Sequence, residues 1–302
     1  MILTRHRLHC WILPLLLVLT ITACSSSSNQ PPQETQATPV ANKQISPLLE
    51  NSIADEAERK RTVIWDMPSG AVSAPEQWNP LARNARRDKG LHQSIIEPLF
   101  ILNYESGFIE PWLGKQMTAN DTLDVWTLTL REGVTWSDGE AFTADDVVFT
   151  VNLVLDNPDL ELDFFAGFTS WVERVEKRDN LTVTFYLTGP NPRFQMDFFA
   201  VKVWGSFDIL PEHIWRDKDP YTFTNYDAEK GWPVFTGPYR LEDFTDNTFV
   251  YVRDDTWWGA RTGFKPLPDP ERMVWTYLLP LDADKHPLIK HLDTMGNVDK
   301  DT

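Results

Sequence analysis

The sequence predicts an α/β domain, and three kinds of pattern carry that prediction. Trp126, Leu128 and Leu130 recur at every second position of residues 125–130, which is the period of a strand. Residues 143–155 then change to helical spacing of apolar side chains. Asp179-Asn180 and Asp246-Asn247 each separate two alternating runs, as the turn of a β-hairpin does.

The other expected elements follow in chain order. Residues 62–66 predict a strand, and residues 88–97 predict a helix that ends before Pro98. Residues 99–103 and 108–112 predict a strand pair around a Glu-Ser-Gly turn. Residues 192–199 and 210–215 predict short helices, and residues 273–277 predict a last strand.

The acids between residues 137 and 146 have structural assignments. Ser137-Asp138-Gly139 predicts a turn, since glycine tolerates a positive φ. Thr143-Ala-Asp-Asp146 resembles a capping box in which Asp replaces the usual Glu. Negative charge at Asp145 and Asp146 also suits the start of a helix. We therefore interpret these acids as turn and cap residues rather than catalytic ones.

The first residues have the pattern of an export signal. A basic start with Arg5 and Arg7, a short apolar run and small residues predict a signal peptide over residues 1–23. Ile-Thr-Ala-Cys24 resembles a lipobox, which predicts lipidation at Cys24 and a lipid anchor in the cell membrane, on its periplasmic face or at the cell surface. An ordinary signal peptide with a chance cysteine is the alternative.

The bulk composition limits the class of protein. Residues 24–61 are polar and predict a flexible tether with weak helix over residues 48–61. Cys10 and Cys24 are the two cysteines, so the exported domain is expected to hold together without a disulfide. A net charge of −16 disfavours nucleic acid as a partner.

Aromatic residues are the best candidates for ligand contact. Twelve of the 13 tryptophans follow Cys24. Tryptophan stacks on sugars and apolar side chains, although packing is the alternative at each position. On loops near strand ends, the ligand-binding candidates are Trp78, Asn79, Trp204, Trp232 and Phe235.

The sequence offers no motif for catalysis or for a cofactor. Gly107–Lys115 lacks the second glycine spacing and the Ser or Thr of a phosphate loop. No Gly-x-Ser-x-Gly or His-Glu-x-x-His is present. We expect no enzymatic activity, no cofactor and no metal site.

Six ordered motifs resemble one family, the bacterial extracellular solute-binding proteins of family 5. They are Glu97-Pro-Leu-Phe100, Pro111-Trp-Leu113, residues 130–149, Leu210-Pro-Glu-His213, Phe235-Thr-Gly-Pro-Tyr239 and Trp257-Trp-Gly259. The resemblance covers residues 62–275. It implies the first lobe of a type II periplasmic-binding-protein-like fold, with a mixed sheet and hairpins.

The resemblance also implies a function. Family members are the oligopeptide, dipeptide, nickel and oligosaccharide receptors of ABC importers, so we expect capture of an extracytoplasmic peptide or oligosaccharide and delivery to permease subunits. The tryptophans slightly favour oligosaccharide. A surface-anchored carbohydrate-binding or adhesion module that needs no transporter is the alternative.

The chain departs from the family in its last residues. Family members continue into a second lobe, whereas residues 276–302 are polar and lose the pattern, which predicts a disordered tail. We expect an incomplete first lobe from a truncated, frameshifted or split gene. The sequence does not distinguish these origins, the ligand, the oligomeric state, or an inner from an outer membrane.

Overall fold

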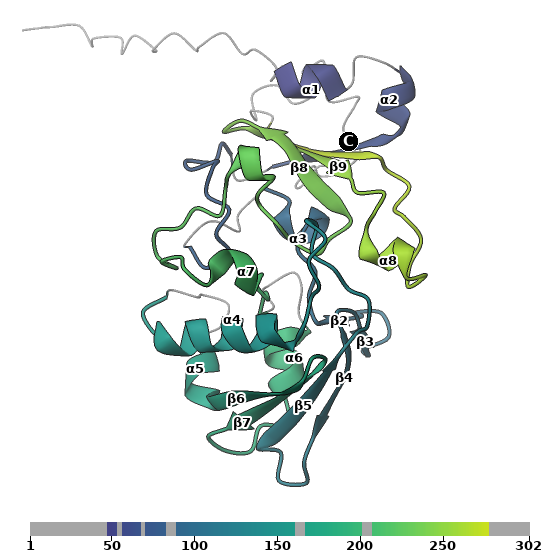
Figure 1. The fold of residues 1–302 in the computed structure, drawn as a ribbon. Coiled ribbons are helices and arrows are strands. Elements are labelled where there is room, and N and C mark those ends of the chain that lie inside the picture. The colour runs from purple at the N-terminus through teal and green to yellow at the C-terminus, as the bar shows by residue number, and fades with distance from the viewer. Residues whose placement is uncertain are drawn as a thin grey trace, which may run out of the picture. The chain divides into compact units, whose positions relative to one another are not determined.

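The computed structural model describes residues 47–52, 56–67, 70–82, 89–160, 167–200 and 207–277 (Figure 1). All of them belong to one unit, Ile45–Thr302. Two short helices open it, α1 (Pro47–Ser52) and α2 (Glu56–Lys60), where the sequence predicted weak helix. None of the helices in these ranges is long and apolar enough to cross a membrane.

The first sheet joins the two ends of the described chain. Its strand order is β1 (Thr62–Asp66), β10 (Arg272–Thr276), β9 (Thr248–Arg253) and β8 (Tyr239–Phe244). β1 and β10 pair in parallel, and the other pairs are antiparallel. Trp65 and Trp275 are partners in the register, and their rings stack with centroids 5.2 Å apart.

The second sheet is antiparallel throughout. Its order is β4 (Gly114–Ala119), β5 (Val125–Leu130), β7 (Thr182–Leu187) and β6 (Val172–Asp179). Along β5 the even-numbered residues from Trp126 to Leu130 are buried and the odd ones are half-buried, as the alternation predicted. A separate pair, β2 (Phe100–Leu102) with β3 (Ile109–Pro111), confirms the expected strand pair.

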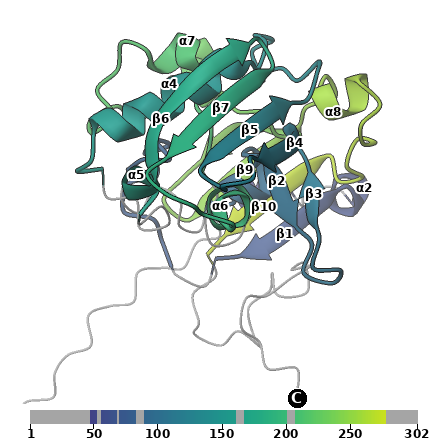
Figure 2. The ribbon, with the colours of Figure 1, turned by 90° about the horizontal axis from the view of Figure 1, so that it is seen from below.

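Helix α4 (Ala144–Asp156) packs on the β4–β7 sheet (Figure 1). Val147, Val151 and Val154 are buried in the larger core with Leu128 and Phe185 from the sheet. The view from below shows β6 and β7 in front of this helix (Figure 2). Around α6 (Phe194–Phe199), further rings complete this core: Phe168, Phe194, Phe198, Phe199 and Phe207.

The predicted capping box is present at the start of α4. The Asp145 amide donates to Thr143 Oγ1 at 3.2 Å, and the Thr143 amide donates to Asp146 Oδ2 at 2.8 Å. Asp146 Oδ1 also accepts from the amide of Glu212, the first residue of α7 (Glu212–Trp215). One buried carboxylate therefore caps two helices.

The expected helix over residues 88–97 is shorter than predicted. The structure has α3 at Leu91–Ser94, because Gly90 has a φ of 74°, outside the helical region. A Cβ at Gly90 would lie 2.1 Å from the indole nitrogen of Trp275, so the close approach of β10 requires glycine there.

Four elements were not predicted: β4, α5 (Phe168–Trp171), the 3₁₀ turn Ala228–Lys230 and α8 (Trp258–Arg261). In β4 only Gly114 and Met117 are buried, which is too little apolar alternation to identify a strand. Thr276, the first residue of the predicted tail, lies in the last strand and pairs with Asp66.

Candidate functional site

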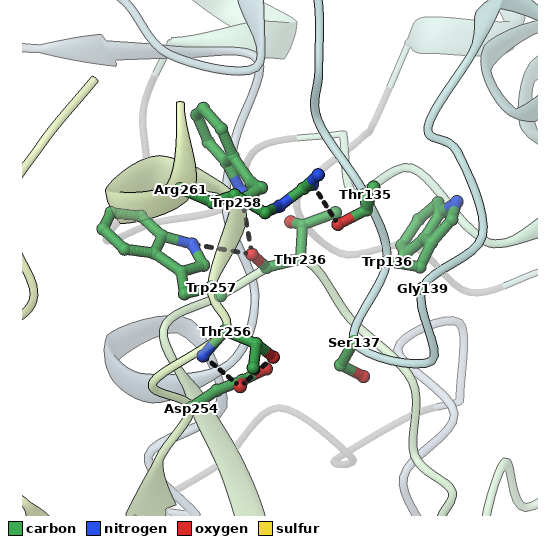
Figure 3. A pocket seen from close by; sticks show the side chains of 11 residues that line it. Thr135, Trp136, Ser137, Gly139, Thr236, Asp254, Thr256, Trp257, Trp258 and Arg261 are labelled. Carbon is green, nitrogen blue, oxygen red and sulfur yellow. Dashed lines mark hydrogen bonds between the residues drawn. The ribbon is translucent and has the colours of Figure 1, made fainter. Parts of the chain in front are cut away.

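A polar pocket lies where β9, α8 and the 133–141 turn meet (Figure 3). Its volume is about 200 Å³. Its walls come from three of the family motifs and from residues on either side of the Trp-Trp-Gly motif. They are Thr135, Trp136, Ser137, Gly139, Thr236, Gly237, Asp254, Thr256, Trp257, Trp258 and Arg261.

Asp254 is the buried acid of this pocket, with 4% of its surface exposed. Its Oδ1 accepts hydrogen bonds from the Arg240 guanidinium and from the amide and hydroxyl of Thr256. Burial alone would raise the pKa of Asp254, but these bonds outweigh it and hold the pKa below its ordinary value. Asp254 is therefore ionised at neutral pH.

Arg261 supplies the positive charge. It stands at the end of α8 and is exposed. Its Nη2 donates to the Gly133 carbonyl at 3.2 Å and to Thr135 Oγ1 at 3.0 Å. These bonds tie α8 to the turn across the pocket.

A junction of tryptophans fixes the wall behind the pocket. The indole nitrogens of Trp257 and Trp258 both donate to the Thr236 carbonyl at 3.0 Å. Trp258 also donates to Glu97 Oε2 at 2.8 Å, while Trp112 donates to Glu97 Oε1 at 2.9 Å. The buried Glu97 carboxylate thus joins three motifs that lie far apart in the sequence.

Gly237 completes this wall by close approach of backbone. Its amide donates to the Ile95 carbonyl at 2.8 Å. A Cβ at this position would lie 2.5 Å from that same oxygen, a distance that real Cβ atoms do not show. The Thr-Gly-Pro-Tyr motif therefore requires glycine for packing against the 95–97 segment.

Two of the predicted ligand contacts are buried in the smaller core. Trp78 and Asn79 have no exposed surface. Asn79 donates to the carbonyls of Pro220 and Phe223 and accepts from the Leu81 amide. In this structure both residues pack within the fold, because the 74–79 segment is enclosed by β8, β9 and the 220–225 loop.

Lys89 holds that segment in place. Its Nζ donates to the carbonyls of Ala74, Pro75 and Gln77 and lies 5.1 Å from the centre of the Trp78 ring. Burial lowers the pKa of Lys89 to about 8.

The other predicted residues are scattered. Phe235 is buried in the smaller core. Trp232 is half-buried, with the ammonium of Lys230 4.7 Å from its ring centre. Trp204 and Cys24 lie outside the described residues, as do residues 1–23 and 278–302. The described candidates therefore do not converge on one pocket.

A second pocket, of about 340 Å³, lies between the start of α4 and α7. Its lining is strongly acidic and includes Asp145, Asp146 and Glu212, with His213 and Arg216. His213 Nε2 lies 2.8 Å from Asp138 Oδ2. In the part of the chain that the structure describes, no three His, Cys, Asp or Glu side chains are grouped to hold a metal ion.

Comparison with known proteins decides the family. Residues 109–284 match the model of the bacterial extracellular solute-binding proteins, family 5 middle. The chain belongs to this family. The motifs that meet at Glu97 and around the pocket are thus among those that resemble this family in sequence.

The matches to named relatives cover only part of the length of those proteins. The nickel-binding periplasmic protein of Escherichia coli (strain K12) is 28% identical over 189 residues, which are 58% of this chain and 32% of that protein. A crystal structure of a periplasmic oligopeptide-binding protein of an oligopeptide ABC transporter from Thermotoga maritima is 30% identical, with a TM-score of 0.65, over 79% of this chain and 42% of that one.

A mannohexaose-bound crystal structure of the Thermotoga maritima protein is similar as well, at 29% identity and a TM-score of 0.65. The match covers 80% of this chain and 42% of that chain. The predicted α/β fold of the periplasmic-binding-protein type is confirmed by this agreement. The chain spans less than half the length of these relatives.

Sequence reasoning missed the residues that build the pocket. Asp254 and Arg261 flank the Trp-Trp-Gly motif but belong to no catalytic pattern, and the sequence indicated no separate role for Glu97, which lies behind the pocket. The available signal was a lone acid in an otherwise apolar stretch, Ile95-Ile-Glu-Pro-Leu-Phe100. Such an acid needs buried donors, and indole N–H groups supply them.

Proposed function

We propose that this chain is the substrate-binding component of an ABC importer, which captures a solute outside the cytoplasm and delivers it to a permease. The observation that carries the proposal is the family match over residues 109–284. The fold shared with the Thermotoga maritima oligopeptide-binding protein supports it. Binding, rather than catalysis, is then the activity of the chain.

Peptide or oligosaccharide is the proposed ligand class. The Thermotoga maritima protein is described as oligopeptide-binding and also holds mannohexaose. Both ligands combine apolar surface with many hydrogen-bonding groups. Indole rings stack on sugars and on apolar side chains alike, so tryptophan contacts suit either class of ligand. The alternative, a surface-anchored carbohydrate-binding module, uses the same stacking without a permease.

A thermal-shift screen of the purified chain tests the ligand class. A ligand that binds the folded state raises the melting temperature, and the rise grows with its concentration. We expect one panel, short peptides or soluble oligosaccharides, to raise it in this way while the other leaves it unchanged. No shift with either panel would contradict the proposed ligand class. Retention on insoluble polysaccharide by the chain alone would instead favour the adhesion module.

The membrane anchor has its own test. Cys24 is proposed to carry the lipid, so radiolabelled palmitate should enter the chain in bacteria. Cys24→Ser should abolish the label, whereas the matched control Cys10→Ser should keep it. Label that persists in Cys24→Ser would contradict lipidation at Cys24 and would leave the proposed ligand class unaffected.

A further inference from the structure

Lys89 is a buried cation that no carboxylate pairs with in the part of the chain that the structure describes. Lys89 is 1% exposed. Its Nζ donates instead to three backbone carbonyls, those of Ala74 at 2.8 Å, Pro75 at 3.1 Å and Gln77 at 2.6 Å. These bonds use all three donors of an ammonium group, but the carbonyls supply no negative charge.

The three carbonyls belong to residues 74–79, which we call the strap. A second set of hydrogen bonds joins the strap to the 220–225 loop. The Trp78 amide donates to a carbonyl of this loop at 2.8 Å, and Asn79 Nδ2 donates to two more, at 2.8 and 2.9 Å. Lys89 and this loop together hold the strap against the smaller core.

The closed strap also buries a donor that has no acceptor. Trp78 has no exposed surface, and its ring packs edge-on against Phe244 and Phe249, with centroids 5.6 and 5.9 Å away. Its indole N–H is buried without a hydrogen-bond partner among the described residues. Buried polar groups nearly always have partners, so this N–H weakens the closed strap, as does the buried charge of Lys89. The strap is therefore poised to open.

The groups around Lys89 determine how its proton matters. Glu76 on the strap favours the charged form. On β9, Tyr251 donates its hydroxyl hydrogen to the Lys89 carbonyl and stays neutral, because burial raises the pKa of Tyr251 well above its ordinary value. On α3, His92 Nε2 lies 3.2 Å from Asp208 Oδ2. Burial outweighs the charge of Glu76 and lowers the pKa of Lys89 to about 8.

An open strap would return Lys89 to water, where the ordinary pKa of a lysine is about 10.4. The closed strap then binds this proton more weakly than the open strap does. A rise in pH between the two values therefore favours closure, with the proton released to solvent. The neutral amine can still donate to two of the three carbonyls.

We propose that Lys89 is a proton-controlled clasp on the strap: the charged ammonium allows the strap to open more readily, and the neutral amine holds it closed. Opening brings Trp78 into water, where its N–H gains an acceptor. This conformational device lies in the smaller core and does not depend on which solute the chain captures.

Hydrogen exchange of the purified full chain tests the clasp. The amides of Gln77 and Trp78 are hydrogen-bonded while the strap is closed, so their exchange reports its opening. After correction for the intrinsic exchange rate at each pH, the opening constant should fall about tenfold from pH 7 to pH 9. Opening of so short a segment exposes little surface, so dilute urea should change the constant little.

Two lysine substitutions locate the effect. Lys89→Met removes the titrating group, so the corrected opening constant should no longer change between pH 7 and pH 9. The matched control is Lys218→Met, because Lys218 is exposed and its ammonium lies 5.6 Å from the ring centre of Phe223 on the 220–225 loop. This control should keep the tenfold change. If Lys89→Met does not fold, the pH profile of the unaltered chain decides.

Three results would overturn the proposal. The first is an opening constant of the unaltered chain that stays level or rises from pH 7 to pH 9. The second is a steep dependence on urea, which would mean that these amides exchange by global unfolding. The third is a tenfold change that persists in Lys89→Met. No ligand is present in these measurements, so their failure is distinguishable from failure of the proposed function.

Discussion

The β4–β7 sheet with α4 and the junction around Glu97 are built in different ways. In the first region, most elements are specified by neighbouring residues: a hairpin joins β6 to β7, and the capping box starts α4. In the second, Glu97, Trp112, Thr236 and Trp258 come from distant segments and meet through side-chain hydrogen bonds. Elements that depend on nearby residues can be predicted from the sequence, whereas contacts between distant segments cannot. The difference also predicts where single substitutions do the most damage.

Glu97→Ala should have the largest effect. Trp112 would lose its acceptor, and Trp258 would keep only the Thr236 carbonyl. We expect the free energy of unfolding to fall by about 3 kcal/mol, measured by urea denaturation followed by tryptophan fluorescence. Glu97→Gln keeps one acceptor oxygen and should lose about half as much. Wild-type stability in Glu97→Ala would show that the junction does not hold the motifs together.

Asp146→Ala should come next, since it affects two helices. The amides of Thr143 and Glu212 would lose their acceptor, at a cost of about 2 kcal/mol in the same denaturation measurement. A loss no greater than that of a single cap would mean that α7 does not depend on this carboxylate.

The same residue gives a pH dependence. Burial is the main cause that raises the pKa of Asp146 above its ordinary value, against the hydrogen bonds that lower it. The folded chain then takes up this proton at a higher pH than the unfolded chain. Its contribution to stability is full below the ordinary pKa of about 3.9 and is lost as pH rises through the folded value. Asp146→Asn should remove that part of the pH profile, and an unchanged profile would contradict the raised pKa.

Thr143→Ala tests the capping box at the start of α4 and should have a smaller effect. It removes one acceptor, for the Asp145 amide, at the start of α4. A loss of about 1 kcal/mol is expected from thermal or urea unfolding. Thr143→Ser retains the hydroxyl and should lie close to the wild type.

Arg193→Gln should have the smallest effect. Arg193 and Asp197 form an exposed pair one helical turn apart. Exposed pairs of this kind contribute at most about 0.5 kcal/mol and are screened by salt. A loss above 1 kcal/mol, or one that persists at high salt, would mean that this pair is coupled to the core beneath α6.

The elements that could be predicted share a physical feature. The strand at 125–130, the hairpin turns at 179–180 and 246–247 and the capping box at 143–146 each depend on residues within a few positions of one another. β4 was missed because buried and exposed side chains alternate only weakly along it. The helix predicted around α3 was too long, because Gly90 packs closely against Trp275 on a distant strand.

The candidate site shows the same division. Trp78 and Asn79 were expected to contact a ligand from a loop near a strand end. The fold instead buries both residues, and Lys89 donates hydrogen bonds to three carbonyls of that loop. Asp254 and Arg261 belong to no recognisable motif in the sequence, and only the fold brings both to the lining of one pocket.

The sequence by itself determined the class of fold, the family and the capped helix, because alternation, turn residues and ordered motifs are local patterns. The tertiary structure alone decided that Glu97 joins three motifs, that Gly237 must lack a side chain and that Asp254 faces a pocket with Arg261. Those facts depend on which distant segments meet, and the energy of a buried charge or a close backbone contact is fixed only by its neighbours in space.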